Sequence, residues 1–373
     1  MRRQPLYESV PNFSEGTRTD VIAELAGAAA KARVLDVDAD PDHNRVVISL
    51  AGDGADVVDA LFASAQVAME HIDLREHRGV HPRVGAADVL PIVPLGGSSL
   101  ASAHELAREL GERIWAELHV PVYFYGHGEA HTLADVRAGR AHPDLGGPDL
   151  HPSAGAACVG ARHILLAFNV LLPGMDFNAA RVLARSVRES AGGLRGVQAL
   201  AFPLPGDRVQ LSMNLFRLDE TPPSAVIEEL ERRGVAIGSQ HVIGLCPAAV
   251  ANPAAHGRLL EARLAAAAAR HGAELCAAQG DDEHTRLAGR LEREAGEIAR
   301  MGVDQGELLA GAERAAALVQ VLRAAGVLGH ELETMLDVAA RGLRSALAAE
   351  TSSRHSARVD ALDRRLGSAS GNP

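Results

Sequence analysis

The stretch Asp73-Leu-Arg-Glu-His-Arg-Gly-Val-His-Pro-Arg-Val-Gly-Ala-Ala-Asp-Val-Leu-Pro-Ile-Val-Pro94 joins a predicted helix to a short apolar strand and closes the first half of the fold. It places His81 among arginines in a chain whose net charge is −11. Pro82 disfavours helical geometry at His81, so this imidazole is expected on a loop or at a strand end. A histidine beside arginines can transfer a proton near neutral pH while the arginines bind carboxylates. The stretch is therefore a candidate catalytic loop for an anionic substrate, and a solvated basic turn is the alternative.

The elements up to the end of this stretch follow the order β-α-β-β-α-β. Apolar runs predict strands at 6–10, 34–38, 45–50 and 89–93. Apolar residues at helical spacing predict helices at 20–31, with Thr19 as its N-cap, and at 58–72. An insert with a helix at 103–118 and a strand at 120–126 then leads into a Gly- and Pro-rich connector.

The same order of elements begins again at residue 162. Strands are predicted at 163–171, 196–203, 208–215 and 235–238, and helices at 176–189 and 224–233. The strict alternation in Arg208-Val-Gln-Leu-Ser-Met-Asn-Leu215 predicts a half-buried antiparallel strand. The repeat is visible in element order and not in residue identity. We therefore predict an α+β fold in which two split-βαβ subdomains pack side by side with a groove between them.

The pattern from Pro247 onward is helical. Helices are predicted at 247–278, 283–301, 305–324 and 328–349. The predicted organisation is an N-terminal subdomain at 1–161, a second subdomain at 162–279 and a helical C-terminal extension at 280–373. An oligomerisation or lid role for the extension is a hypothesis that rests on its amphipathic spacing.

Composition excludes several classes of protein. The acidic net charge argues against general nucleic-acid binding, which requires a basic surface. No apolar run reaches the length of a membrane span without a charge, and the N-terminus lacks the apolar region of a signal peptide. Cys158, Cys246 and Cys276 are widely spaced, as expected for reduced thiols. The sequence therefore predicts a cytoplasmic protein that binds neither nucleic acid nor membrane.

Several stretches together resemble a known family. They are Val10-Pro-Asn-Phe-Ser-Glu-Gly16, Asp36-Val-Asp-Ala-Asp-Pro-Asp-His-Asn-Arg45, His81-Pro-Arg-Val-Gly-Ala-Ala-Asp88, Val120-Pro-Val-Tyr-Phe-Tyr-Gly126, Pro143-Asp-Leu-Gly146, Gly155-Ala-Ala-Cys-Val-Gly-Ala-Arg162 with Ala167-Phe-Asn169, and Gly238-Ser-Gln-His-Val-Ile-Gly-Leu245. In this order they resemble the formiminotransferase family, also called glutamate formimidoyltransferase, which forms the N-terminal half of formiminotransferase-cyclodeaminase.

The resemblance implies a one-carbon transferase of histidine degradation. The expected reaction moves the formimino group of N-formimino-L-glutamate to tetrahydrofolate, giving L-glutamate and 5-formiminotetrahydrofolate. The resemblance also implies two ferredoxin-like subdomains with a folate tunnel between them, in a homodimer. No metal is expected, because Asp36-x-Asp-x-Asp40 has Pro41 where the glycine of a calcium-binding EF-hand loop belongs.

The resemblance also indicates site residues. His81 matches the family's catalytic histidine and is expected to act as general acid/base. The substrate- and folate-binding candidates are Asn12, Asp38, Arg45, Arg83, Gly146, Gly147, Pro148, Asp149, Leu150, His151, Pro152, Ser153, Ala154, Gly155 and Gln240. A guanidinium such as that of Arg83 binds a carboxylate through two hydrogen bonds, although a surface salt bridge is an equal alternative. Asp38 and Asn12 could instead be turn residues.

Two departures from the family leave other functions open. The connector between Gly126 and Pro143 is short, and the family's Arg-Gly-Glu-Tyr-like piece is represented only by Arg137-Ala-Gly-Arg140. No motif of a cyclodeaminase domain is visible in the helical extension. The alternatives are formyl transfer between 5-formyltetrahydrofolate and glutamate, a non-catalytic folate-binding protein, and a structural helical adaptor.

Overall fold

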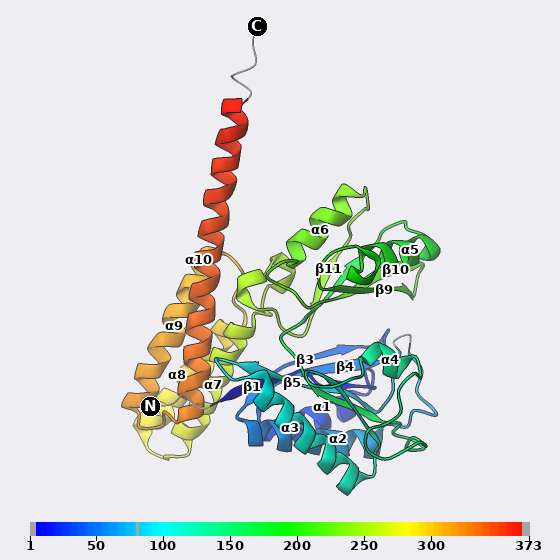
Figure 1. The fold of residues 1–373 in the computed structure, drawn as a ribbon. Helices are drawn as coiled ribbons and strands as arrows, with labels where there is room; N and C mark the ends of the chain where they lie inside the picture. The colour runs from blue at the N-terminus through cyan, green and yellow to red at the C-terminus, as the bar shows by residue number, and fades with distance from the viewer. Residues whose placement is uncertain (1–4, 80–81, 368–373) are drawn as a thin grey trace.

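The computed structural model describes residues 5–79 and 82–367 and shows a mixed α+β protein with a helical C-terminal region (Figure 1). Two sheets lie one above the other, each packed against helices on the face turned away from the other sheet. The C-terminal helices lie along one side of this pair. The predicted α+β class and the predicted helical C-terminal region are confirmed.

The first sheet has seven strands. They are β1 (Leu6–Ser9), β2 (Asn12–Phe13), β3 (Arg33–Asp40), β4 (Arg45–Gly52), β5 (Ala87–Leu95), β6 (Val122–Gly126) and β7 (Ala157–Ala161). β1 and β2 follow one another between β4 and β5, and both pair antiparallel with these two neighbours. β3 pairs with β4 at one edge, whereas β7 and β6 extend the sheet beyond β5 in parallel.

Alternation in the strands gives the first sheet one apolar face. Val46, Ile48 and Leu50 of β4 are buried against α1 (Thr19–Ala28), α2 (Gly54–His71) and α3 (Leu100–Arg113). Because successive side chains of a strand point to opposite faces, Arg45 and Ser49 belong to the face that is turned to the second sheet. The first sheet therefore presents a partly polar surface to its neighbour.

The second sheet has four antiparallel strands. They are β8 (Leu166–Leu171), β9 (Val197–Leu204), β10 (Arg208–Leu215) and β11 (Gln240–Ile243), in the order β11-β8-β10-β9. Leu211 and Met213 of β10 pack in a core with α5 (Phe177–Val187) and α6 (Pro223–Arg232). The half-buried antiparallel strand predicted at 208–215 is confirmed with these bounds. In both sheets, the last strand of the β-α-β-β-α-β run lies next to the first.

Two predicted strand assignments differ from the structure. The strand predicted at 235–238 is wrong, because the strand is β11 and residues 234–239 form a connection. Gly234, with φ +73°, ends α6, and the chain needs the following residues to reach the edge of β8. β7 is not predicted from the sequence, because Ala-Cys-Val-Gly-Ala has low strand propensity.

Two predicted helix boundaries also differ. Thr19 is the first helical residue rather than the N-cap, and Glu15 accepts hydrogen bonds from the amides of Thr17 and Arg18 just before the helix. The single helix predicted at 247–278 is wrong in its first part. Residues 247–259 contain two short 3-10 turns, because Pro253 cannot continue a helix from the preceding residues.

The helical region consists of α7 (Leu260–Ala277), α8 (Asp282–Ala299), α9 (Gln305–Ala324) and α10 (His330–Gly367). α7 packs against α8 and α10, and α9 packs against α10. Alanines on α7 are fully buried and permit this close approach. The helices also contact the first sheet, where Arg33 and Glu331 form an ion pair at 3.2 Å. No helix in the described residues is long and apolar enough to cross a membrane.

Candidate functional site

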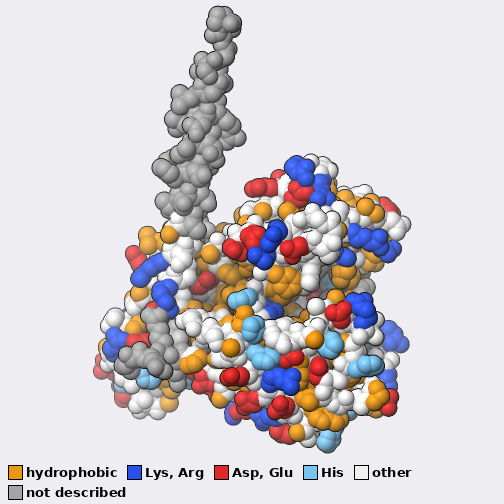
Figure 2. Space-filling model, viewed as in Figure 1, with side chains coloured by type: hydrophobic (Ala, Val, Ile, Leu, Met, Phe, Trp, Pro, Cys, Tyr) orange, Lys and Arg blue, Asp and Glu red, His pale blue; other side chains and the backbone are white. Residues whose placement is uncertain are grey.

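The candidate site lies between the sheet faces that the helices leave uncovered. On the first sheet this face carries Arg45 and Ser49 of β4, and on the second it carries Asn169 of β8 and Gln210 of β10. Figure 2 shows a hollow between the two lobes, with hydrophobic side chains inside it and histidines along its rim. The site is therefore built from two surfaces that are distant in sequence.

A group of polar side chains on the first sheet surrounds the buried carboxylate of Asp88. We call Asn12, Arg45, Asp88 and Arg137 the basic cluster. Arg45 donates from Nε and Nη2 to Asn12 Oδ1 at 2.9 and 2.7 Å. Asp88 Oδ2 accepts from Arg45 Nη1 at 3.2 Å and from Arg137 Nη2 at 3.3 Å. Two guanidiniums therefore share one carboxylate, which leaves the basic cluster with a net positive charge.

Burial is the main influence on the pKa values of the arginines. Burial lowers the pKa of Arg45 to about 10, against the opposing effect of Asp88, and the nearby charges of Arg137 and Arg83 lower it further. Burial likewise lowers the pKa of Arg83. An anion bound beside these groups would stabilise their charged forms. The basic cluster is thus suited to bind a carboxylate.

Backbone contacts fix Asp88 at the start of β5. Its Oδ1 accepts hydrogen bonds from the amides of Val84 at 2.6 Å and Gly85 at 3.3 Å. A Cβ at Gly85 would overlap the carbonyl oxygen of Ala156, so the close approach of these two segments requires glycine. The position of the Asp88 carboxylate therefore depends on the close packing of the backbone at Gly85 against that at Ala156.

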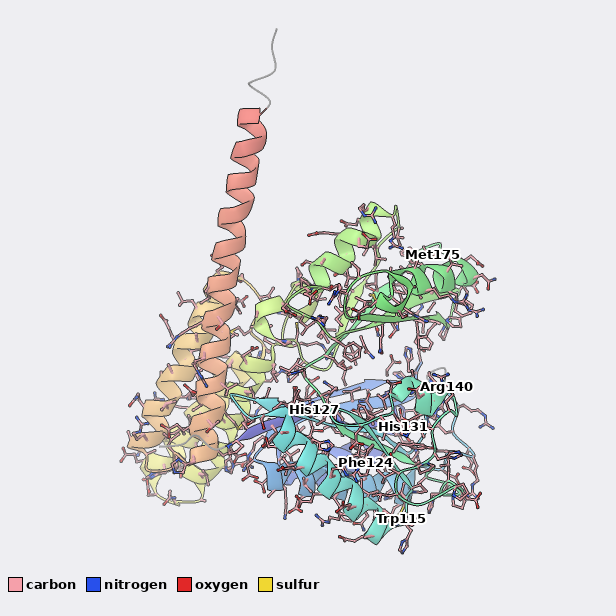
Figure 3. All side chains as sticks on the ribbon, in the orientation of Figure 1. Trp115, Phe124, His127, His131, Arg140 and Met175 are labelled. Carbon is pink, nitrogen blue, oxygen red and sulfur yellow. The ribbon has the colours of Figure 1, made fainter. Side chains whose placement is uncertain are left out.

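Arg137 enters the site from a short helix in the connector, α4 (Leu133–Arg137). Thr132 and Asp135 form a capping box at its start, which fixes the helix although it is only five residues long. Figure 3 shows Arg140, which follows α4, on the side of the first sheet that faces the second. The connector that looks short in sequence thus contributes a guanidinium to the basic cluster.

The loop that precedes β5 is attached to the turn between β3 and β4. His77 Nε2 lies 3.0 Å from the carbonyl oxygen of Asn44, whose side chain in turn donates to the carbonyl of Arg78 at 2.8 Å. Arg83 contacts His77 Nδ1 and donates to the carbonyl of Gly79 at 2.6 Å. His81, the expected catalytic residue, lies outside the described residues.

Asp38 lies at a contact between the two sheets. Its Oδ2 accepts from Arg258 Nη1 at 2.8 Å and from the amide of Gly244 at 3.1 Å. Asp36, two residues earlier, pairs with Arg258 at 3.3 Å and with Arg263 at 3.4 Å. Burial raises the pKa of Asp36, against the opposing effect of the two arginines. Both of these hydrogen bonds of Asp38 are therefore to the segment that follows β11.

The third carboxylate of this strand also has a partner. Asp40 accepts from the amide of His43 at 3.0 Å and lies 2.7 Å from His43 Nδ1. Burial alone would raise the pKa of Asp40, but these hydrogen bonds lower it overall. Within residues 5–79 and 82–367, no group of three or more His, Cys, Asp or Glu side chains could hold a metal ion.

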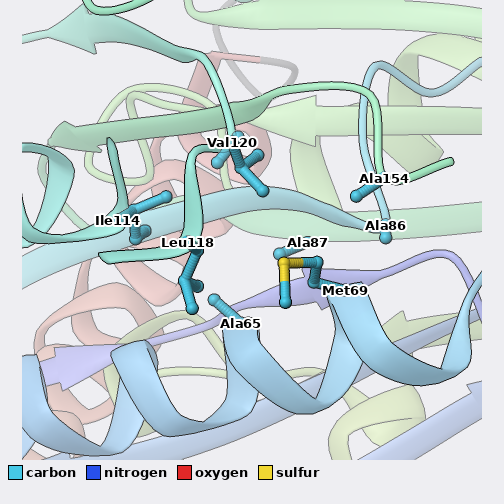
Figure 4. Close-up of a pocket in the computed structure, with 9 residues that line it drawn as sticks. Ala65, Met69, Ala86, Ala87, Ile114, Leu118, Val120 and Ala154 are labelled. Atoms are coloured by element: carbon cyan, nitrogen blue, oxygen red, sulfur yellow. The ribbon is translucent and has the colours of Figure 1, made fainter. Parts of the chain in front are cut away.

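The loop at 146–155 lies partly beside the start of β5. His151 and Gly155 exchange backbone hydrogen bonds at 2.9 Å, and Ala156 donates to the carbonyl of Val84 at 3.1 Å. The residues at 147–150 are exposed. A small apolar pocket lies next to this loop, on the helical side of the sheet (Figure 4); it is lined by Ala65, Met69, Ala86, Ala87, Ile114, Leu118, Val120, Ala154 and Ala157. It has no titratable side chain, so the candidate site is the opposite, polar face.

Gln240 is not brought together with the basic cluster. It pairs in β11 with Val170, whose side chain is in the core of the second lobe, and its Oε1 accepts from Asn252 at 3.1 Å. The neighbouring His241 pairs with Asn169 and shares its face. The residue of β11 that belongs to the groove side is therefore His241 rather than Gln240.

Buried polar atoms that lack a hydrogen-bond partner in the described part of the chain gather on the two facing surfaces. They are Ser49 Oγ, Tyr125 Oη, Arg137 Nε, Asn169 Oδ1 and Gln210 Nε2; another pair is found at the Arg33–Glu331 contact. Burial raises the pKa of Tyr125 to about 12, so its hydroxyl is a neutral donor. Because unpaired buried polar groups are costly, these atoms are candidate contacts for a ligand. These atoms have no signal in the sequence beyond the alternation of β10, which places Gln210 opposite the apolar residues of that strand.

Comparison with known proteins identifies similar sequences. Residues 6–162 match the family model described as the formiminotransferase domain, N-terminal subdomain. The glutamate formimidoyltransferase of Thermoplasma acidophilum is 38% identical over 268 residues, which cover 65% of this chain and 88% of the relative. The glutamate formimidoyltransferase of Streptococcus pyogenes serotype M1 is 35% identical over 267 residues, which cover 65% of this chain and 89% of the relative.

A longer relative matches over the same part of the chain. The formimidoyltransferase-cyclodeaminase of Rattus norvegicus is 36% identical over 273 residues, which cover 65% of this chain and 50% of the relative. The similarity to all three relatives thus leaves about a third of this chain outside the matched region.

Proposed function

This chain belongs to the formiminotransferase family, and we infer that it transfers the formimino group of N-formimino-L-glutamate to tetrahydrofolate. The products are 5-formiminotetrahydrofolate and L-glutamate. The observation that carries this conclusion is the similarity to two relatives named glutamate formimidoyltransferase, of which the chain covers 88% and 89%. Tetrahydrofolate is a co-substrate of this reaction.

We propose that His81 is the general acid/base of the transfer. A nitrogen of tetrahydrofolate attacks the amidine carbon and loses a proton, and the glutamate nitrogen gains a proton as its bond to that carbon breaks. One imidazole with a pKa near neutrality can accept the first proton and deliver the second. Arg83, two residues further along the chain, supports this role, because its guanidinium can bind a carboxylate of the anionic donor.

The basic cluster is proposed to bind the carboxylates of formiminoglutamate. Its net positive charge and the lowered pKa of Arg45 favour an anion at this place. Arg137 has an additional donor, since its buried Nε has no hydrogen-bond partner among the described residues. Arg83 lies close enough to affect the pKa of Arg45 and is proposed to assist.

We also propose how the chain is divided into subdomains. The strand order shared by the two sheets supports two ferredoxin-like subdomains, at 1–161 and 162–279, with folate between them. We further propose a cytoplasmic homodimer that takes part in histidine degradation. The contact of α7 with α8 and α10 supports a structural connection between the second subdomain and the extension at 280–373.

The test is turnover by the purified protein. Tetrahydrofolate and N-formimino-L-glutamate are mixed with the enzyme, and release of glutamate is followed. His81→Ala should lower kcat by roughly 100-fold to 10,000-fold, the range for loss of a general acid/base. His71→Ala is the matched control, because His71 pairs with Glu24 at 3.3 Å at the end of α2 and should leave turnover unchanged.

The outcomes separate the alternative functions. Turnover with 5-formyltetrahydrofolate and glutamate, but not with formiminoglutamate, would indicate formyl transfer. Binding of tetrahydrofolate in calorimetry without any turnover would indicate a folate-binding protein. Turnover by His81→Ala at the wild-type rate would support the proposed reaction but contradict the role of His81 as general acid/base.

A further inference from the structure

The second sheet presents an ordered polar surface to the groove. Pairing across its strands places Phe202 beside Gln210 in one row, and Leu200, Ser212 and Asn169 in the next. We call Asn169, Gln210 and Ser212, together with Leu200 and Phe202, the amide wall. Asn169 and Gln210 are diagonal neighbours on β8 and β10, close enough for one ligand to contact both.

The two amides are buried and incompletely bonded. Asn169 is 7% exposed and Gln210 is 8% exposed. Asn169 Oδ1 and Gln210 Nε2 have no hydrogen-bond partner among the described residues. One unpaired acceptor and one unpaired donor, side by side on a surface, match a ligand edge that presents an N–H next to a C=O. Such an edge is a cyclic amide, or lactam.

Contacts between the lobes hold the amide wall opposite the basic cluster. His43, in the turn before β4, contacts Phe202 edge-on with ring centroids 5.3 Å apart. The adjacent Asp42 pairs with Arg208, at the start of β10, at 3.4 Å. Arg45 follows this turn directly on β4, so the amide wall and the basic cluster approach each other from the two sheets.

The two surfaces differ in charge. The basic cluster has an excess of positive charge, whereas the amide wall is neutral and flanked by apolar side chains. Formiminoglutamate carries carboxylates, and the reduced pterin ring of tetrahydrofolate is neutral and carries a lactam edge. Transfer requires the two substrates to meet with their reacting atoms in contact, which binding on opposite surfaces allows.

We propose that Asn169 and Gln210 bind the lactam edge of the pterin ring of tetrahydrofolate, with Leu200 and Phe202 contacting the ring. This inference rests on the proposed function and assigns the co-substrate to the second sheet. The basic cluster on the first sheet then binds the donor. Asn169 and Gln210 are positioning residues under this assignment.

The test separates the pterin ring from the rest of the folate. Asn169→Ala and Gln210→Ala should each raise KM for tetrahydrofolate roughly 10-fold, as expected for one lost neutral hydrogen bond in a buried place. KM for formiminoglutamate should change by less than about twofold. The dissociation constant of 6-methyltetrahydropterin, which has the ring alone, should rise by the same factor as that of tetrahydrofolate.

Two further variants serve as controls. Gln210→Leu keeps the size of the side chain and should weaken pterin binding as Gln210→Ala does. Gln198→Ala removes an exposed amide from the same face of β9 and should bind the pterin as the wild type does. Circular dichroism and the thermal midpoint show whether each variant is folded.

Four outcomes decide the inference. Unchanged affinity of the folded variants for 6-methyltetrahydropterin overturns it, and so does a raised KM for formiminoglutamate alone. A wild type that binds the pterin without releasing glutamate, and loses that binding in Asn169→Ala, contradicts the proposed reaction but supports the amide wall. Absence of pterin binding in a folded wild type overturns both.

Discussion

Replacing Asp88 by asparagine tests the charge arrangement of the basic cluster. Asp88 is 1% exposed, and its carboxylate accepts hydrogen bonds from two guanidiniums at 3.2 and 3.3 Å. Asparagine can still accept from the amides of Val84 and Gly85, but its NH2 group would meet donors on Arg45 and Arg137. Removing one partner of a buried ion pair costs about 3–5 kcal/mol. The side chains of Arg45 and Arg137 are 14% and 24% exposed, so the expected loss in the free energy of unfolding is about 3 kcal/mol, the lower end of this range.

Trp115 provides the assay for this loss. It is the one tryptophan of the chain and packs against Gly146, next to the first sheet, so its fluorescence reports unfolding of that lobe. With a urea slope of about 2–3 kcal/mol per M, a loss of ~3 kcal/mol shifts the midpoint down by about 1–1.5 M. Asp88→Asn made in the Arg137→Ala background should lower the free energy of unfolding by less, because one fewer guanidinium is left without a carboxylate.

The reasoning is refuted if the midpoint of Asp88→Asn stays within about 0.3 M of the wild type at an unchanged slope. A loss that is identical with and without Arg137 would instead show that the two side chains are energetically independent. The first result would mean that water rather than the buried carboxylate stabilises both guanidiniums, and the second would assign the loss to Arg45 alone.

Three other predictions follow from the described contacts. Burial raises the pKa of Glu8 from 4.5 to about 7, so the folded state binds this proton more tightly than the unfolded chain does. The free energy of unfolding should therefore fall by roughly 3 kcal/mol between pH 4.5 and 7. Across the same pH window, the urea midpoint of Glu8→Gln should fall less steeply than that of the wild type. Arg137→Ala should raise KM for formiminoglutamate by at least ~10-fold in steady-state kinetics, whereas Arg140→Ala, which removes an exposed partner of Asp135, should not; equal effects would contradict the role of α4. Gly85→Ala should destabilise by at least ~2 kcal/mol because its Cβ would overlap Ala156, whereas Gly27→Ala, in an open position of α1, should stabilise by ~0.5–1 kcal/mol, and calorimetry that gives both the same sign would refute the packing argument.

Local pattern predicted those parts of the fold whose signal lies within a few residues. The alternation at 208–215 gave β10 with its bounds, and the apolar runs near residues 45–50 and 89–93 lie within β4 and β5. The strand predicted at 235–238 failed because Val-Ala-Ile has the composition of a strand, whereas pairing with β8 places the strand at β11. Short apolar segments do not specify which partner they reach.

The candidate site was less predictable, because its contacts join residues that are far apart in sequence. Asn12 and Arg45 are both candidate binding residues from the sequence, and they contact each other, although their contact has no local signal. Arg258, the partner of Asp38, is 220 residues away and has no local signal. Asn169 and Gln210 look like solvent-facing residues of half-buried strands. Only the packing of one sheet over the other makes them buried and leaves their amides without partners.

The pairing of Asp38 with Arg258 also sets an order of events during synthesis. The first lobe can pair its own strands once residue 161 has left the ribosome, but Asp36 and Asp38 then still lack the cations that hold the second lobe above them. Those cations arrive just before and within α7, after both sheets are complete in sequence. The last of the contacts between the lobes in chain order is therefore made by a segment that lies outside both walls of the groove. A nascent chain that stops before residue 258 would carry both surfaces of the groove, but it would lack the ion pairs of Asp36 and Asp38 with Arg258 and Arg263.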